Sequence, residues 1–217
     1  MFVRVLKSAS IALLVIFILY QVIVRLVRHY YKFPIPAPMV ELIDNPLRRR
    51  LLHPPAQMVR RHGIQPGMTV LEVGPGKGTY TLETARQLGP QGRMVAIDIE
   101  PTIIERLQTR AQASGINNLE ARVADVHALP FEDASFDAIT MMATLGEIPD
   151  ADRALDELRR VLKPGGVLAI SEFLVDPDYQ PFASLMRRME QHRFHLKQRS
   201  GNFFSYSAQF EPVAESA

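Results

Sequence analysis

The sequence contains no cysteine. This absence excludes disulfides, thiolate nucleophiles, cysteine-bound zinc and the cysteine-held iron–sulfur clusters that radical enzymes require. With 217 residues, the chain is also too short for two substantial enzymatic domains. We therefore expect one folded core with an appendage, and no metal site.

The chain has little net charge, a formal +2, but this charge is unevenly distributed. Residues 1–62 contain ten Lys and Arg against two Asp and Glu, whereas residues 63–217 contain 15 against 21. A basic segment can bind nucleic acid, but this one flanks an apolar run, which favours an anionic membrane surface. We therefore expect a lipid bilayer as a partner, and no nucleic acid.

The apolar run covers residues 8–24, SASIALLVIFILYQVIV, and carries no charge over 17 positions. As a helix it would be about 26 Å long, and an extension to Val27 brings it to the thickness of a hydrocarbon core, about 30 Å. Basic residues precede the run, and basic residues with two tyrosines follow it. We predict a membrane anchor at residues 8–27 that spans the bilayer or lies in its interface. Positive charge is heavier after the run, which predicts that the domain following it lies on the cytoplasmic side.

A buried core helix and a cleaved signal peptide are the alternatives for this run. The first is disfavoured because the run is apolar on every side and precedes the core. The second is disfavoured because no small-x-small cleavage site follows the run.

Residues 33–62 are predicted to be a spacer with N-terminal helices. Three alternating prolines at its start stiffen the backbone, and Asn45 is a candidate helix cap. The predicted division is thus an anchor with its basic flank at 1–32, this spacer, and a cofactor-binding domain at 63–217. The sheet and its cofactor site should be complete without residues 1–32.

From Met68 onward, short apolar runs alternate with amphipathic stretches of 12 or so residues. Such alternation predicts right-handed crossovers and a mostly parallel sheet covered on both faces. The strands are expected at 68–73, 93–98, 119–125, 136–142 and 166–175, and the helices at 79–89, 101–115 and 150–166. The KPGG sequence at 163–166 is expected to turn the chain from the last helix into its strand, without a chemical role.

Residues 194–212 form two β-like runs that meet near Gly201, which predicts an antiparallel hairpin closing the sheet. Alternate residues of the second run should share one face and belong to the core: Phe204, Tyr206, Ala208 and Phe210. Phe203 should point the other way.

The first predicted strand leads into GPGKG, residues 74–78, with Glu72 two positions before the first glycine. Such loops bind dinucleotides, mononucleotides and S-adenosylmethionine alike. The dinucleotide pattern G-x-G-x-x-G is not matched, because the third glycine comes one residue early and Thr79 follows. Acidic residues end the next two strands. Asp98 can accept hydrogen bonds from both hydroxyls of a ribose, and Asp125 is placed to hold an adenine amino group.

Four motifs now occur in order: the glycine loop with its leading acid, Asp98, ADVHALPFEDASFDAI at 124–139 and LRRVLKPGGVLAISEF at 158–173. Together they resemble the class I S-adenosylmethionine-dependent methyltransferases, and within them the ubiquinone/menaquinone-biosynthesis type, over about residues 45–212. The resemblance implies a Rossmann-like α/β fold with a mostly parallel seven-stranded sheet, an N-terminal hydrophobic helix before it, and S-adenosyl-L-methionine as the cofactor.

The resemblance also implies roles for single side chains. Glu72 would fix the loop and the amino group of the cofactor, Asp98 would hold the ribose hydroxyls, and Ile99 would pack on the adenine. Asp125 and Val126 would read the adenine edge. The whole implied cofactor site is Glu72, Gly74, Pro75, Gly76, Gly78, Asp98, Ile99, Asp125, Val126 and Met142. Alternatively, Glu72 and Asp125 cap helices or turns.

Methyl transfer from a sulfonium is an in-line displacement of an activated leaving group, so positioning can supply much of the catalysis. No Asn/Asp-Pro-Pro-aromatic sequence follows the fourth strand, which argues against transfer to the amino groups of bases or glutamine. Glu147 is the catalytic candidate, as a base or an orienting group, with a surface position as the alternative. His127 and Tyr80 are weaker candidates.

A membrane anchor favours a lipophilic acceptor, such as a lipid or a quinone precursor. The alternatives are a cofactor-binding membrane assembly factor, a methyltransferase for a soluble small molecule, and a nicotinamide-dependent reductase. The glycine spacing disfavours the reductase.

Overall fold

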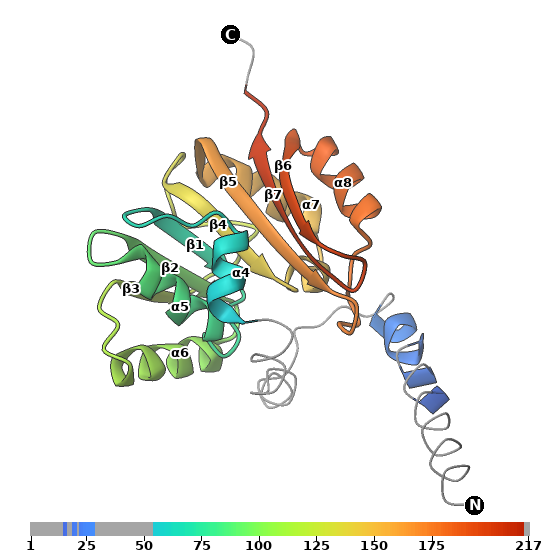
Figure 1. Cartoon of the computed structure of the whole chain (residues 1–217), viewed down its shortest axis with the longest axis horizontal. Helices are drawn as coiled ribbons and strands as arrows, with labels where there is room; N and C mark the ends of the chain where they lie inside the picture. Colours follow the sequence, from blue (N-terminus) through green and yellow to red (C-terminus); the bar gives the residue numbers. More distant parts are fainter. Residues whose placement is uncertain (1–14, 17–18, 21, 29–53, 215–217) are drawn as a thin grey trace, which may run out of the picture.

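The computed structural model describes residues 15–16, 19–20, 22–28 and 54–214. A seven-stranded sheet forms the centre of the described residues, with the strand order β3-β2-β1-β4-β5-β7-β6 (Figure 1). The first five strands pair in parallel, and β7 pairs antiparallel with both β5 and β6. The strands are β1 (Thr69–Val73), β2 (Arg93–Asp98), β3 (Leu119–Val123), β4 (Phe136–Met142), β5 (Leu162–Phe173), β6 (Phe194–Gly201) and β7 (Ser205–Pro212). The predicted parallel sheet with a C-terminal hairpin is confirmed.

Helices cover both faces of the sheet because successive side chains of its strands point to opposite faces. In β1, Val70 packs with α4 and α5 on one face, whereas Leu71 and Val73 belong to the larger core with α7 and α8 on the other. The helices are α4 (Pro55–Arg61), α5 (Thr79–Leu88), α6 (Pro101–Ala113), the short 3-10 helix η1 (Leu145–Glu147), α7 (Ala151–Val161) and α8 (Phe182–Gln191). The sequence patterns had not indicated α8, which buries only two large apolar side chains, Leu185 and Met189.

Two details of the predicted elements are wrong. Residues 163–166 do not precede β5 but lie within it, because α7 already ends at Val161. Phe136 of β4 pairs with Leu162 of β5, whereas Ala138 pairs with Val167, so KPGG forms an irregularity in the strand. Phe204 is not in the core but 68% exposed. Its alternation with Tyr206 fails because the chain is still turning at 204, and β7 begins only at Ser205.

Residues 22–28 are helical and contact the loop that follows β5. The Arg25 guanidinium donates to the carbonyl oxygens of Leu174 and Asp176, the latter at 3.1 Å. Arg28 pairs with Asp178, and the two side chains are 5% and 7% exposed. These contacts join the helical segment to the domain, whereas all seven strands come from residues 69–212. The expectation that the domain is complete without residues 1–32 stays a prediction.

Across the residues that the structure describes, no helix combines the length and the apolar character needed to cross a membrane. Half of the predicted anchor at 8–27 lies outside the described residues, as does the spacer up to residue 53 with its helix start at Asn45.

Candidate cofactor and acceptor site

A cavity of about 310 Å³ lies beyond the carboxyl ends of the parallel strands. This is where ligands bind in open α/β sheets. Nine of the ten residues predicted for the cofactor line it: Glu72, Gly74, Pro75, Gly76, Asp98, Ile99, Asp125, Val126 and Met142. The catalytic candidate Glu147 and the weaker candidates Tyr80 and His127 line the same cavity. The structure thus brings together side chains from four strand ends, while their individual roles remain predictions.

The glycine loop is shaped for close approach to a ligand. Gly74 and Gly76 have φ angles of 72° and 52°, in the left-handed region that favours glycine. A Cβ added at Gly74 would lie 2.6 Å from Cγ2 of Thr144, so a side chain there would displace the cavity wall. Gly78 does not line the cavity. It precedes α5 with a φ of 74°, and a Cβ there would overlap Leu107 of α6, which indicates a packing role.

Glu72 ends β1 as a buried carboxylate. Its side chain is 2% exposed, and its Oε2 has no hydrogen-bond partner among the described residues. Burial raises the pKa of Glu72 from its ordinary value to about 7. An orphaned buried acceptor beside a bare glycine loop fits a ligand that supplies a cationic donor, as the amino group of S-adenosylmethionine does.

Asp98 and Ile99 form the next part of the wall, at the end of β2. The Asp98 Oδ1 accepts a hydrogen bond of 3.0 Å from the backbone amide of Glu100, which fixes the orientation of the carboxylate. Burial raises the pKa of Asp98. Ile99 lines the cavity with an exposed apolar side chain. A polar acceptor next to an exposed apolar side chain suits a ribose joined to a flat base.

Asp125 stabilises a local turn. Its Oδ1 accepts the backbone amide of His127 at 2.9 Å and lies 2.6 Å from the Nδ1 of the same histidine. The bond from that amide holds the pKa of Asp125 below its usual value. Asp125 thus caps a turn, as the alternative interpretation predicted. Its side chain also borders the cavity, beside the buried Val126.

The opposite end of the cavity, here called the acceptor end, is formed by residues that follow β4 and β5. Met142, Ile148, Pro149 and Phe173 contribute apolar surface, and Glu147, on η1, is half-buried among them. The sequence analysis did not identify Ile148, Pro149, Phe173 or Asp176 as site residues. Their positions near the ends of two predicted strands could have indicated them, because the carboxyl ends of parallel strands meet at one edge of the sheet.

Negative charge gathers behind the acceptor end. Glu172 is buried, and its Oε2 accepts the backbone amide of Gln180 at 3.2 Å. Burial raises the pKa of Glu172 well above its ordinary value, and the nearby Asp176, Asp178 and Glu147 raise it further. In the described part of the chain, no group of three His, Cys, Asp or Glu side chains is arranged to hold a metal ion.

Comparison with known proteins gives a consistent result. Residues 64–209 match the family model described as "Methyltransferase domain". The chain is 35% identical over 156 residues to the ubiquinone/menaquinone biosynthesis C-methyltransferase UbiE of Escherichia coli O1:K1 / APEC, and equally to UbiE of Shigella boydii serotype 18. The match covers 71% of this chain and 61% of the length of those relatives.

Solved structures share the fold. A SAM-dependent methyltransferase from Aquifex aeolicus superposes with a TM-score of 0.77 at 23% identity, covering 83% of this chain and all of that one. The [4+2]-cyclase SpnF superposes with a TM-score of 0.64 at 18% identity, covering 74% of this chain and 80% of that one. At these identities the likeness concerns the fold alone.

Proposed function

Since the chain belongs to the methyltransferase domain family, with S-adenosylmethionine as its cofactor, we propose that it methylates a lipophilic acceptor at a membrane surface. The apolar acceptor end of the cavity carries this proposal. Met142, Ile148, Pro149 and Phe173 offer a wall that suits an apolar ring. A polar acceptor would lose its hydration there without regaining equivalent hydrogen bonds.

The acceptor atom that we propose is a ring carbon of a quinone precursor. The support comes from the UbiE relatives, which are C-methyltransferases of ubiquinone and menaquinone biosynthesis. The cofactor supplies a methyl group on a sulfonium, whose C–S bonding electrons stay with sulfur. The acceptor carbon forms the new C–C bond and loses its proton. Glu147 lies at the acceptor end, on η1, and can receive that proton.

The cavity walls supply orientation. Holding the two reacting carbons in line can lower the activation barrier by about 7–11 kcal/mol, so a single catalytic base is sufficient. The apolar side chains of Met142, Ile148 and Phe173 offer few partners for water beside the half-buried Glu147.

Membrane action is proposed from the uncharged run at 8–24 and its basic flank. The contacts of Arg25 and Arg28 with the loop after β5 add support, because they join the segment behind this run to a loop whose Asp176 lines the cavity. The cytoplasmic side is proposed for the domain, where the cofactor is supplied.

The test uses the full chain in vesicles of phosphatidylcholine and phosphatidylglycerol, with S-adenosylmethionine carrying a labelled methyl group. Quinols with a polyprenyl tail are compared with water-soluble analogues that lack the tail. We expect label in the tailed quinols, and a lower rate for Glu147→Gln with unchanged binding of S-adenosylhomocysteine. Equal labelling of the tailless analogues would refute a lipophilic acceptor. Cofactor binding without any labelling would favour an assembly factor instead.

A further inference from the structure

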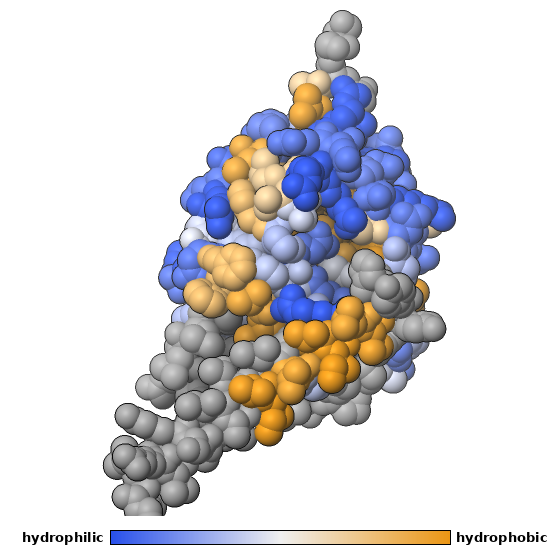
Figure 2. All heavy atoms as spheres, turned by 90° about the vertical axis from the view of Figure 1, so that its right-hand side faces the viewer, coloured by the Kyte–Doolittle hydropathy of each residue, from blue (hydrophilic) through white to orange (hydrophobic). Residues whose placement is uncertain are grey.

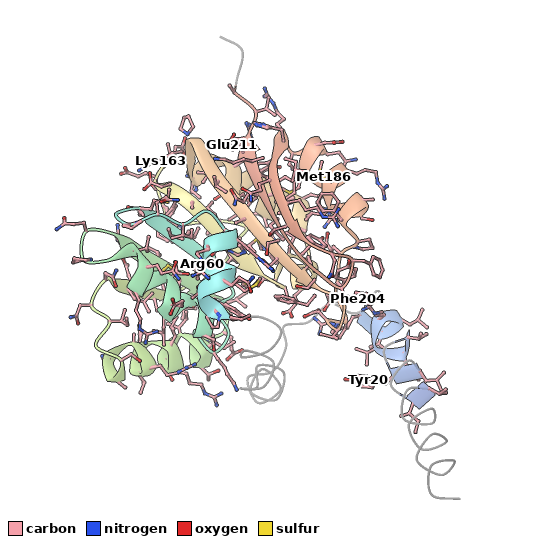
Figure 3. The ribbon with its side chains drawn as sticks, viewed as in Figure 1. Tyr20, Arg60, Lys163, Met186, Phe204 and Glu211 are labelled. Atoms are coloured by element: carbon pink, nitrogen blue, oxygen red, sulfur yellow. The ribbon has the colours of Figure 1, made fainter. Side chains whose placement is uncertain are left out.

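A group of exposed apolar side chains lies on one side of the domain, and we call it the apolar rim. It combines Val175 and the hairpin residues Phe203 and Phe204, which are 55%, 60% and 68% exposed, with residues of the N-terminal helical segment. The helical members are Val22, Ile23, Leu26 and Val27. Figure 2 shows apolar side chains gathered in the lower part of this face. In Figure 3, Phe204 lies at the end of the hairpin near that segment.

Hydrogen bonds make the rim continuous. The Leu174 amide donates to the Phe204 carbonyl oxygen at 2.8 Å, and the Tyr179 hydroxyl donates to the Phe203 carbonyl oxygen at 2.7 Å. Arg25 donates to the Leu174 carbonyl oxygen, which joins the helical segment to the same loop. The rim is therefore one surface built from three parts of the chain that are distant in sequence.

The turn that carries the two phenylalanines is tightly built. Asn202 Oδ1 accepts the backbone amides of Phe204 at 2.9 Å and Ser205 at 3.2 Å, and the Asn202 amide donates to the Ser205 carbonyl oxygen at 2.8 Å. Gly201 has a φ of 95°, and a Cβ there would overlap the Ser205 backbone. The turn thus presents both aromatic rings at the surface, where the Phe203 ring packs edge-on against Tyr179, with 6.1 Å between the ring centroids, and both phenylalanines stay more than half exposed.

We propose that the apolar rim, with Phe203 and Phe204 at its centre, inserts into the interface of a lipid bilayer and so places the acceptor end of the cavity against the membrane. This inference rests on the proposed membrane action. Val22 and Ile23 of the rim belong to the uncharged run at 8–24, so the rim is continuous with that run. Residues 1–62 carry ten basic against two acidic side chains, which complements anionic lipid.

The acidic residues near the rim are compatible with this placement. Asp178 is buried and paired with Arg28, so its charge is not presented to lipid headgroups. Asp176 lines the cavity, and its Oδ1 accepts the Asp178 amide at 2.8 Å. The loop between β5 and α8 therefore contributes residues to both the rim and the cavity. A lipophilic acceptor could pass from the bilayer to the acceptor end without crossing water.

The absence of tryptophan from the chain permits a direct test. Phe204→Trp in the full chain introduces a single tryptophan in the rim, which can be excited selectively over the six tyrosines. Val213→Trp is the matched control, because Val213 follows β7 at the other end of the same hairpin and is 41% exposed. Both proteins are mixed with phosphatidylcholine–phosphatidylglycerol vesicles, with and without bromine-labelled acyl chains. Vesicle sedimentation and binding of S-adenosylhomocysteine are measured on the same samples.

We expect the emission of Phe204→Trp to shift to shorter wavelength with vesicles and to be quenched by the brominated chains, while Val213→Trp changes little. Replacing both rim phenylalanines by serine should weaken the vesicle partitioning of the full chain about tenfold or more, whereas Val213→Ser should not.

Sedimentation with the vesicles but no quenching at Phe204→Trp would refute the inference and leave the membrane proposal intact. Failure of the wild-type chain to sediment with vesicles, with cofactor binding retained, would refute both. An emission shift that appears without vesicles and grows with protein concentration would show that a second copy of the chain covers the rim, which also overturns the inference.

Discussion

Replacing Glu72 by glutamine should change the pH dependence of stability in a defined direction. Burial raises the pKa of Glu72 from about 4.5 to about 7, so the folded protein keeps a proton between these values that the unfolded chain releases. The free energy of unfolding must therefore fall as the pH rises through this window. At 1.36 kcal/mol per pKa unit, wild type should lose about 2–3 kcal/mol relative to Glu72→Gln between pH 5 and pH 8.

Urea unfolding followed by circular dichroism measures this difference. Glutamine keeps the shape of the side chain but does not ionise, so Glu72→Gln should match wild type near pH 5 and exceed its stability at pH 8. The comparison cancels groups that both proteins share. One is the buried His62, whose pKa is lowered to about 4 by burial and which contributes in the opposite direction, with stability gained as pH rises from about 4 to 6.5.

The cofactor provides the second readout. A cationic amino group beside the Glu72 carboxylate favours its ionised form, so saturating S-adenosylhomocysteine should reduce the loss of stability at pH 8. The affinity of wild type should rise as the pH passes about 7, while that of Glu72→Gln stays flat. Parallel stability curves for the two proteins from pH 5 to pH 8 would refute a buried, proton-holding Glu72.

Three further predictions concern the loop, the ribose site and the helical segment. Asp98→Ala should weaken S-adenosylhomocysteine binding by about 1.5–3 kcal/mol for each hydrogen bond lost to the charged group, and unchanged affinity in calorimetry would remove Asp98 from the ribose site. Gly74→Ala should abolish binding of S-adenosylhomocysteine. Gly67→Ala is the control, because Gly67 also has a positive φ, 84°, but has open space around it, so this variant should bear a similar backbone strain and still bind. Equal affinities of the two variants would contradict the close-approach role of Gly74. Arg28→Met should lower the unfolding free energy by about 3 kcal/mol, because Asp178 would lose a buried cation, and an unaltered urea midpoint would show that the pair contributes nothing.

The sequence predicted the strands, most of the helices and the position of the cavity because these depend on local patterns. Apolar runs with β-branched residues give strands. Glu72, Asp98 and Asp125 each lie near the end of a strand, so a parallel sheet brings them together at one edge. Glycine spacing was informative for a similar reason, since Gly74 and Gly76 have left-handed φ angles that other residues rarely adopt.

The remaining features depend on contacts between distant segments. Helix α8 is an exception, because it is amphipathic and its buried Leu185 and Met189 are four residues apart, so a local pattern was present and was overlooked. Phe204 fits the alternation of β7, yet the side chain of Asn202 ends the turn one residue later than the pattern implies. The contact of Arg28 with Asp178 joins residues 150 positions apart, and no local pattern predicts such a pair.

The contacts of Arg25 and Arg28 with the loop after β5 also bear on how the protein can be handled. Glu147, Asp176 and Asp178 make this end of the molecule rich in acidic side chains, and two of the cations that face it come from the segment behind the apolar run. Proteolysis or a shortened gene that removes this segment would therefore remove counter-charges from the acceptor end. A shortened protein that binds S-adenosylhomocysteine normally but turns over slowly would be slow because these cations are missing. Its low rate would therefore give little information on which acceptor the longer chain prefers.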